Sequence, residues 1–422
     1  MDILLFVVGL FSLCRNKLAL TITIIYVLCS TYMQFNIVDP LFVNVFFVHN
    51  VCDLGLILYV LMFAKLVITY GVSLYGPMQK SVTVFFIFLL LNGLYDVFLC
   101  ETSIGDAIRF LRSWIPLTIV YVKFGISTDI AERSFRQLGL FTVIMSAIVL
   151  VQIVTPIQLI KFDQIDGRGI KPPITSIIFG AFYLLDYWKM SRLHRFAASL
   201  LCVVPMLLNL RMTYTISVLL IVLIAVLFSK KVGNGMKIFY LATVLSFSFV
   251  FLSLDNRFSD RLLNMYAETE TISSGETSGN FSYRILHSME RLRYITASPD
   301  TAIRGIGYVS ETNYTHETFT LGVYNDEKGR VDQLDNGDIL WSNVFVRVGL
   351  LGLALYLWMY GRLMNIYIRN RYADRKNSMW FAYLLVSLLF TSLGNDTMWY
   401  GYFFLYPILV MDVRSKAFKY DT

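Results

Sequence analysis

Arginines at the ends of apolar segments, or inside them, are the chemically informative residues of this chain. Arg109 and Arg112 lie one helical turn apart, with Asp106 beside them. Arg211 opens a second apolar segment, and Arg347 lies inside a third. A guanidinium group stays charged and binds oxyanions bidentately, and charges inside a membrane usually face a cavity. These arginines are therefore predicted to bind a phosphate group. The alternative is that they extend to the membrane interface or pair with a carboxylate, as Arg109 would with Asp106.

A second group of candidates lies in a polar segment late in the chain. Residues 283–297 carry apolar side chains at helical spacing, which predicts a helix. Arg284 and Arg291 are seven positions apart and share one face of it, where they would contact a phosphate or a sugar. The alternative is a solvated helix surface. Gly305 and Gly307 follow, and glycine allows a tight turn or a close backbone approach.

Carboxylates and histidines in the same polar segment are candidate proton acceptors. Asp335 and Asp338 stand just before an apolar segment. A carboxylate there is able to act as a general base, and the alternative is that it caps the following helix. His287 and His316 are further candidates, with simple exposure to solvent as the alternative.

The composition predicts the elements that position these residues. Hydrophobic residues make up 56% of the chain and charged residues 15%, whereas a soluble domain has about 25% charged residues. Apolar stretches of about 18–25 residues recur along the chain, which is the length that crosses a bilayer. Backbone polar groups must be satisfied internally there, which requires helices. The predicted fold is an all-α integral membrane bundle of 12–13 spans, near 3–14, 18–35, 53–75, 81–99, 105–123, 137–158, 174–188, 195–210, 211–228, 237–254, 339–363, 377–394 and 397–413.

Basic residues predict the orientation of these spans, because Lys and Arg are enriched in cytoplasmic loops. The clusters on the side interpreted as cytoplasmic are Arg15 and Lys17; Lys123, Arg133 and Arg136; Lys189, Arg192 and Arg195; Lys230, Lys231 and Lys237; Arg369, Arg371, Arg375 and Lys376; and Arg414, Lys416 and Lys419. The outer stretches 36–52, 100–104 and 394–397 hold no Lys or Arg, although 159–173 breaks the pattern. Three regions follow from this topology: a membrane bundle over 1–254, a large extracytoplasmic loop over 255–338, and the last three spans with a cytoplasmic tail over 339–422.

Several function classes are not favoured by the sequence. The net charge of +7 is explained by the topogenic clusters and does not indicate nucleic-acid binding. The five cysteines show no paired spacing, so we expect no disulfide framework and no zinc site. No phosphate-binding loop, dinucleotide fingerprint, HExxH or GxSxG sequence occurs, and no cofactor or metal is expected.

The loop region and the span after it carry a pattern that resembles a known family. The segment RILHSMERLRYITASP begins at Arg284, AIRGIGYVS contains Gly305 and Gly307, and DNGDILWSNVFVRVGLLG contains Gly349 and Gly352. This pattern is similar to that of the O-antigen polymerase and O-antigen ligase superfamily of bacterial envelope glycan enzymes. Members share a many-span bundle of GT-C-like glycosyltransferase architecture and a large late periplasmic loop. Motif-level similarity covers about 284–352, and the topology covers the whole chain.

The resemblance implies inverting, metal-independent glycosyl transfer on the periplasmic face of the bacterial inner membrane. The donor is a glycan on undecaprenyl diphosphate, and the acceptor is a hydroxyl of another lipid-linked repeat unit. Asp338, Asp335 and Arg284 are the implied catalytic residues, and the implied diphosphate ligands are Arg211, Arg291, Arg109 and Arg112. Ligases of the family have a histidine where this chain has Asp338, which favours a polymerase.

Three alternatives remain at this stage. A ligase would transfer finished glycan to a lipid A core, but this chain has Asp338 where a ligase is expected to have a histidine. A flippase or transporter of lipid-linked sugars would be expected to contain a repeat and short, even loops, which the sequence does not show. A membrane scaffold without chemistry would not need arginines in its spans. A protein that regulates chain length is a possible partner of the polymerase, and no nucleic acid is expected.

Overall fold

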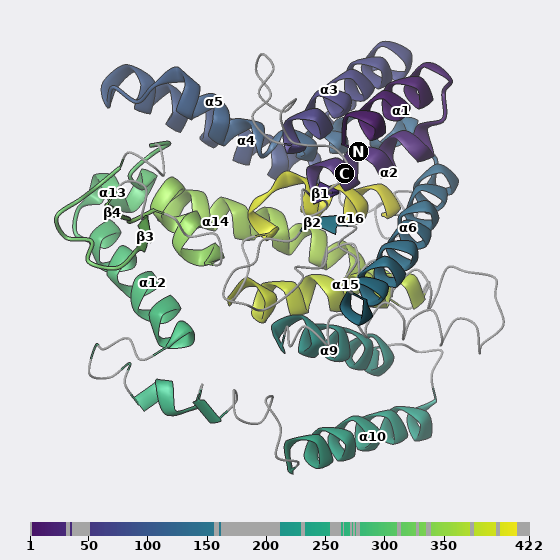
Figure 1. Cartoon of the computed structure of the whole chain (residues 1–422). Helices are drawn as coiled ribbons and strands as arrows, with labels where there is room; N and C mark the ends of the chain where they lie inside the picture. The colour runs from purple at the N-terminus through teal and green to yellow at the C-terminus, as the bar shows by residue number, and fades with distance from the viewer. Residues whose placement is uncertain are drawn as a thin grey trace. The chain divides into compact units, whose positions relative to one another are not determined.

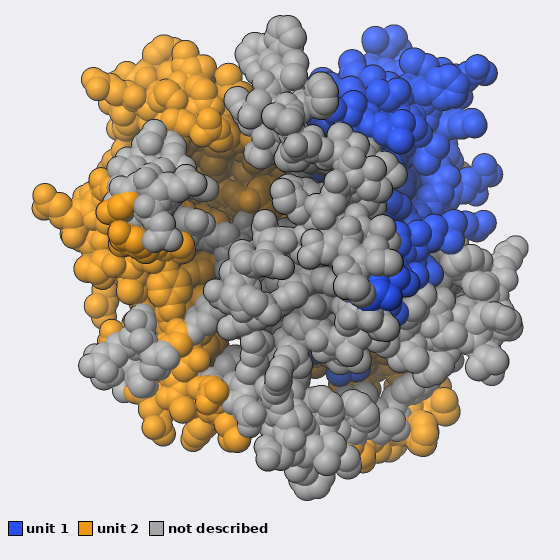
Figure 2. Space-filling model, in the orientation of Figure 1, with its two compact units in different colours: residues 1–76, 115–219, 404–422 blue, residues 77–114, 220–403 orange. Residues whose placement is uncertain are grey.

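The computed structural model describes residues 2–30, 34–35, 51–155, 160–161, 212–228, 233–253, 263–264, 266–270, 272, 275, 279–309, 314–325, 329–334, 339–371, 375–393 and 397–411. Within them the chain is almost entirely helical (Figure 1). Two short antiparallel ladders are its strands: β1 (Gln34–Phe35) pairs with β2 (Ile160–Lys161), and β3 (Val323–Asn325) pairs with β4 (Arg330–Asp332). The chain forms two compact units, coloured blue and orange in Figure 2, which are described separately.

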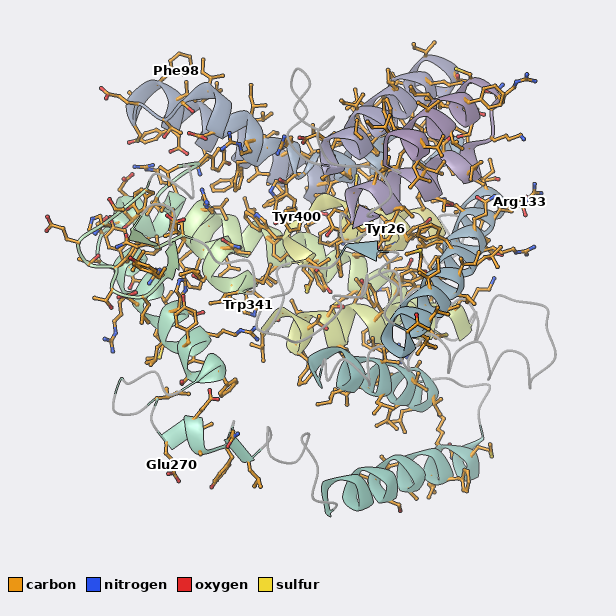
Figure 3. All side chains as sticks on the ribbon, viewed as in Figure 1. Tyr26, Phe98, Arg133, Glu270, Trp341 and Tyr400 are labelled. Atoms are coloured by element: carbon orange, nitrogen blue, oxygen red, sulfur yellow. The ribbon has the colours of Figure 1, made fainter. Side chains whose placement is uncertain are left out.

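The first unit comprises residues 1–76, 115–219 and 404–422. Its described helices are α1 (Asp2–Cys14), α2 (Leu18–Cys29), α3 (Val51–Tyr70), the 3-10 helices Ile115–Tyr121 and Lys123–Gly125, α6 (Thr128–Val154), the start of α9 (Met212–Phe228) and α16 (Leu405–Val410). Helix α2 is the centre of this unit, because it packs against α1, α3 and α6 and is buried from Thr21 to Cys29. Arg133 projects from α6 with a largely exposed side chain (Figure 3).

Hydroxyl groups connect the helices of the first unit. The hydroxyl groups of Ser12 and Thr21 lie 2.7 Å apart between α1 and α2. The Ser134 hydroxyl lies 3.1 Å from that of Thr23 and 2.8 Å from that of Tyr406. Small hydroxyl side chains suit apolar helix packing, since they allow close approach and find partners locally.

The second unit comprises residues 77–114 and 220–403. Its further described elements are α4 (Gln79–Leu99), α5 (Ile104–Arg112), α10 (Asn234–Ser253), α12 (Asn280–Thr296), α13 (Pro299–Arg304), α14 (Leu340–Arg369), α15 (Arg375–Leu389), and the 3-10 turns Thr391–Leu393, Thr397–Trp399 and Gly401–Phe404. Helix α14 is its centre and packs against α4, α12, α13 and α15. The backbone of α14 is kinked at Gly349, where φ is 64°.

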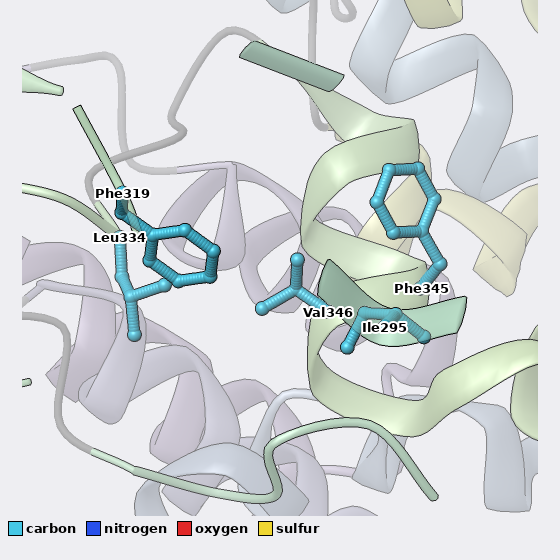
Figure 4. Close-up of a cluster of buried hydrophobic side chains, with 5 residues drawn as sticks. All are labelled: Ile295, Phe319, Leu334, Phe345 and Val346. Atoms are coloured by element: carbon cyan, nitrogen blue, oxygen red, sulfur yellow. The ribbon is translucent and has the colours of Figure 1, made fainter. Parts of the chain in front are cut away.

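A buried apolar cluster fixes the polar segment onto the first part of α14. Ile295 of α12, Phe319 and Leu334 of the segment after α13, and Phe345 and Val346 of α14 form this cluster (Figure 4). Each is at most 6% exposed. The helix predicted over 283–297 is therefore confirmed as α12, which packs on α13 and α14. Of its regularly spaced apolar side chains, Ile295 is buried, whereas Met289 and Leu292 are 43% and 41% exposed.

Three described helices are long and apolar enough to cross a membrane: Cys52–Tyr70, Gln79–Leu99 and Leu340–Arg369. An all-α membrane protein is thus confirmed at this coarse level. Many large apolar side chains on α4 are exposed, among them Leu91 at 61% and Phe98 at 77%, as expected of a helix that faces lipid.

Several predicted spans differ from the structure in detail. The span predicted over 105–123 is broken, because α5 ends at Arg112 and a 3-10 helix follows over Ile115–Tyr121. Pro116 has no N–H to donate, which disfavours a continuous α-helix there. The span predicted over 397–413 consists of 3-10 turns and the short α16. Helix α2 ends at Cys29, short of the predicted residue 35. The spans predicted over 174–188 and 195–210 lie outside the described residues.

Candidate functional site

A buried carboxylate joins the polar segment to the end of α4. Asp96 lies in the last turn of this apolar helix and is fully buried. Its Oδ1 accepts a hydrogen bond from Arg304 Nη1 at 3.0 Å, and its Oδ2 accepts one from the Tyr308 N–H at 2.8 Å. A buried carboxylate is costly without such partners. The 304–308 backbone and the end of α4 are therefore held as one structure.

The Arg304 guanidinium donates hydrogen bonds to two carboxylates, those of Asp96 and Asp300. Its Nε and Nη2 donate to Asp300, one turn back in α13, at 2.9–3.0 Å. The Arg304 guanidinium also lies over the Tyr95 ring, 4.5 Å from its centre. Hydrogen bonding to Asp300 raises the pKa of Arg304, and the same contact lowers the pKa of Asp300. The pair stays charged, which supplies a permanent cation opposite Asp96.

Gly307 is required by the approach to Asp96. Its φ is 83°, and a β-carbon there would lie 2.3–2.5 Å from the Asp96 carboxylate. A side chain at this position would displace the carboxylate from its partners. The next residue, Tyr308, donates its hydroxyl to the Leu89 carbonyl at 2.8 Å and stacks on Phe110 with ring centres 3.8 Å apart. The sequence-predicted role of Gly307, a close backbone approach, is thereby explained.

Gly305 makes the second close approach, against α14. A β-carbon on Gly305 would lie 2.3 Å from the Val346 carbonyl oxygen, and one on Gly349 would lie 2.4 Å from the Ile303 carbonyl oxygen. The Ile306 N–H donates to the same Val346 carbonyl at 2.8 Å. Val346 lies one turn before the kink at Gly349. The segment around Gly305 therefore packs against α14 where its regular backbone hydrogen bonding is interrupted. Asn92 completes the contact by donating to the Arg304 carbonyl at 3.2 Å.

Arg291 is buried at the centre of the polar segment. Its guanidinium contacts the Glu290 carboxylate and the Leu321 carbonyl, and donates to the Gln333 carbonyl at 2.7 Å. It also lies 4.3 Å from the centre of the Phe319 ring. Burial lowers its pKa, and Glu290 opposes this. These contacts give Arg291 a local structural role, and its predicted role as a diphosphate ligand stays a prediction.

His287 lies one turn before Arg291 and is fully buried. Its Nδ1 is 3.1 Å from the hydroxyl of Ser342, at the start of α14. Burial lowers the pKa of His287 to about 3, and the Arg291 cation contributes in the same direction. The imidazole is thus neutral at physiological pH and joins α12 to α14.

Arg284 is half-buried near the start of α12. That helix end is held by Glu268, whose carboxylate accepts from the N–H groups of Phe281 and Ser282 at 2.8 and 3.0 Å. A carboxylate at a helix N-terminus satisfies donors that the helix leaves open. Arg284 therefore projects from a helix that is fixed at its start by Glu268 and farther along by His287 and Arg291.

Arg109 and Arg112 lie on α5, a short helix capped by Ser103, rather than inside a span. The Arg109 side chain is 59% exposed and contacts Asp106 at 3.2 Å. Helix α5 packs on α4, while α12 packs on α13 and α14, and Figure 1 draws α5 and α12 on either side of α13. The described contacts do not join Arg109 to Arg284. Arg347 is buried and donates to the Val309 carbonyl, so it pairs within the protein.

The remaining predicted residues are placed in part. Arg211, Asp335 and Asp338 lie outside the described residues. His316 is half-buried; its backbone N–H donates to Gln333 Oε1 at 2.6 Å, and its Nδ1 is 2.8 Å from the Thr318 hydroxyl. Among the described residues, no three His, Cys, Asp or Glu side chains are grouped closely enough to hold a metal ion.

Asp96 and Arg304 were missed by the sequence reasoning. Asp96 is a carboxylate inside an apolar run, which by itself marks a residue with a function or a partner. Arg304 stands directly before Gly305 in the quoted motif but has no spacing that relates it to Asp96, which lies 208 positions away. No protein-family model matches the chain, and no curated protein matches it significantly.

Proposed function

We propose that this protein polymerises undecaprenyl-diphosphate-linked oligosaccharide repeat units by inverting glycosyl transfer on the outer face of the bacterial inner membrane. In this proposal the bundle has 12 or 13 spans, and 255–338 is a periplasmic loop that lies over them. The proposed reaction rests on the sequence pattern of residues 284–352. The structural support is the attachment of the segment carrying Arg284 to the ends of two apolar helices.

The contact of Asp96 with Arg304 and Tyr308 is the observation that carries the proposal. It joins a polar segment to the last turn of a helix that is apolar enough to cross a membrane. A diphosphate on a lipid lies at the same level, where the hydrocarbon meets water. An enzyme acting on such a substrate needs polar groups held rigidly at that boundary. In this proposal the segment 280–308 supplies these groups.

The reaction forms one bond and breaks one. The acceptor hydroxyl oxygen attacks C1 of the donor sugar, and the bond between C1 and the diphosphate oxygen breaks with its electron pair going to the diphosphate. A carboxylate takes the hydroxyl proton, and Asp338 and Asp335 remain the proposed bases. Arg284 stabilises the negative charge that develops on the leaving diphosphate. The lipid diphosphate supplies the free energy, so no nucleotide is needed.

We assign this role to Arg284 of α12, because the quoted sequence pattern begins at this residue. Arg291 contacts Glu290 and two backbone carbonyls inside the segment, which gives it a structural role. Arg293 is exposed on the same helix and serves as a matched control. The three arginines thus separate into a proposed catalytic residue, a structural residue and a surface residue within ten positions of one helix.

The test is the length of glycan made by cells carrying Arg284→Ala or Arg293→Ala. Arg284→Ala should give single-repeat products with normal amounts of folded protein, and Arg293→Ala should give normal long chains. Purified protein with synthetic undecaprenyl-diphosphate oligosaccharide should give a ladder of products that Arg284→Ala abolishes. Loss of all lipid-linked repeats from the outer face would instead indicate a flippase. Long chains from the Arg284 variant would remove this assignment.

A further inference from the structure

Two cysteines from different helices meet in the first unit. Helix α2 ends at Cys29, and Cys52 is the second residue of α3, which packs along α2. The Cys29 side chain is in hydrogen-bond contact with that of Cys52. Cys29 is buried, whereas Cys52 is partly exposed. Cys52 is thus the more exposed residue of the pair.

Gly55 explains why the two helices approach so closely at this point. It lies one turn after Cys52, and a β-carbon there would be 2.7 Å from Cys29 Sγ and 2.9 Å from the Cys29 backbone nitrogen. The absence of a side chain at 55 lets the end of α2 rest on the first turn of α3. The contact between Cys29 and Cys52 therefore follows from close packing of the α2 and α3 backbones.

The charge pattern gives the compartment that these thiols face. Arg15 and Lys17 stand at the opposite end of α2 from Cys29, whereas the stretch 36–52 between the two helices has no Lys or Arg. In the proposed orientation the cysteine end lies on the extracytoplasmic side. Disulfides form and persist there, because cytoplasmic thiol reductants do not act in that compartment.

We propose that Cys29 and Cys52 form a disulfide that closes the outer ends of α2 and α3. The oxidant is a protein disulfide of an extracytoplasmic thiol oxidase. The more accessible Cys52 thiolate attacks it, forming a mixed disulfide and releasing one oxidase thiol. The Cys29 thiolate then attacks Cys52 Sγ and releases the second. Two protein thiols are oxidised, their two electrons reduce the oxidase disulfide, and their two protons are taken up by the oxidase sulfurs, which leave as a dithiol.

The bond has a measurable consequence for stability. It closes a ring over the 22 residues between the cysteines, which restricts the unfolded chain. Reduction should therefore lower the melting temperature by on the order of 5 °C. The disulfide lies outside the residues proposed for glycosyl transfer, so glycan length does not report on it.

The decisive experiment counts thiols in protein taken from cells. A variant with Cys14→Ser, Cys100→Ser and Cys202→Ser keeps only the proposed pair. Cells are quenched in acid, and the protein is denatured and alkylated with a polyethylene-glycol maleimide, with or without prior reduction. The expected result is no added tag without reduction and two with it, and two without reduction in cells lacking the thiol oxidase. Two tags without reduction in oxidase-competent cells would overturn the proposal.

If the thiol count contradicts the proposal, two further experiments separate the possible reasons. Purified protein treated with diamide tests the geometry alone: resistance to oxidation shows that the thiols do not meet. In a cysteine-free chain, Glu270→Cys and Arg133→Cys test orientation with an impermeant maleimide on intact cells. Labelling at 270 and not at 133 is expected. The reverse pattern would show that the pair faces the cytoplasm, which also overturns the proposal. The proposed glycosyl transfer is tested independently of these experiments, by Arg284→Ala and Arg293→Ala.

Discussion

Gly305 and Gly349 meet backbone to backbone, and each adopts a positive φ, 76° and 64° respectively. Neither position has room for a β-carbon, because each would clash with a backbone carbonyl oxygen of the other segment. The motif glycines of the polar segment and of α14 are thus one structural feature, although 44 positions separate them. This crossing sets the position of everything between α12 and the kink of α14.

Alanine substitutions should separate strain from collision at this crossing. Gly305→Ala combines positive-φ strain, about 1–3 kcal/mol at φ 76° and ψ −162°, with overpacking against the Val346 carbonyl, about 1–3 kcal/mol. Gly329→Ala has the strain alone, since φ is 60° and no atom lies within 4 Å. Gly361→Ala has neither and replaces glycine inside a helix, a gain of up to about 1 kcal/mol. Unfolding in mixed detergent micelles should rank the three in this order. Equal losses at 305 and 329 would show that the crossing is not rigid.

The two carboxylates bound to Arg304 should contribute unequally. Arg304 contacts Asp96 at 3.0 Å and Asp300 at 2.9 Å, but the Asp96 side chain is fully buried and that of Asp300 is 57% exposed. Exposed pairs contribute about 0–1 kcal/mol, whereas removing one partner of a buried pair costs about 3–5 kcal/mol. A double-mutant cycle of Asp96→Asn with Arg304→Gln should therefore give a coupling energy of about 2 kcal/mol or more.

The matched cycle of Asp300→Asn with Arg304→Gln should give less than about 1 kcal/mol. Both cycles use the free energy of unfolding in the same micelles, so the shared Arg304→Gln variant serves as an internal control. Distance alone would predict equal coupling energies. Equal values would mean that Asp96 is reached by water and that the segment is not sealed onto α4.

The positions of the long helices follow from sequence, but the contacts between distant segments do not. Helices α3, α4 and α14 were predictable because their apolar runs are long enough to span a membrane, and α12 because its apolar side chains recur at helical spacing. The break after Arg112 was missed because hydropathy does not register Pro116, which cannot donate to a helix.

The candidate site was predictable only in its local features. The motif glycines 305 and 307 were recognised, but the carboxylate that makes Gly307 necessary lies on α4, and no local spacing relates Asp96 to it. Arg291 was placed on the correct helix, yet its partners are backbone carbonyls, which carry no side-chain signature in a sequence. Periodicity predicts which face of a helix is apolar, but not which distant carbonyl a guanidinium will bind.

Arg291→Lys should loosen the segment that Arg291 holds. A lysine ammonium is a single point charge and cannot serve Glu290 and two carbonyls in the planar arrangement of a guanidinium. Losing one charge-assisted hydrogen bond costs about 1.5–3 kcal/mol, so tryptic cleavage at Arg330 should become on the order of 10-fold faster or more. Arg293→Lys, two positions along on the exposed face, should leave the rate unchanged. Equal rates in both variants would show that Arg291 does not hold the 321–333 backbone.

His287 should make the protein less stable in mild acid. Burial and the Arg291 cation lower its pKa from 6.5 to about 3, so between these values the unfolded chain binds a proton that the folded chain does not. Stability is therefore undiminished above pH 6.5 and falls as the pH drops below it, by up to about 1.4 kcal/mol per pH unit. From pH 7.5 to 5.0 the loss from His287 alone should be about 2 kcal/mol.

His287→Gln should remove this part of the pH dependence, because glutamine does not titrate and still offers a polar group to Ser342. The measurement is the free energy of unfolding at pH 7.5, 6.5, 5.5 and 5.0 for the parent chain, His287→Gln and His316→Gln. The parent and His316→Gln should fall together below pH 6.5, since His316 lies outside the interface of α12 with α14, while His287→Gln should change less. An unchanged slope in His287→Gln would show that the imidazole is hydrated and that α12 is not sealed against α14 at this point.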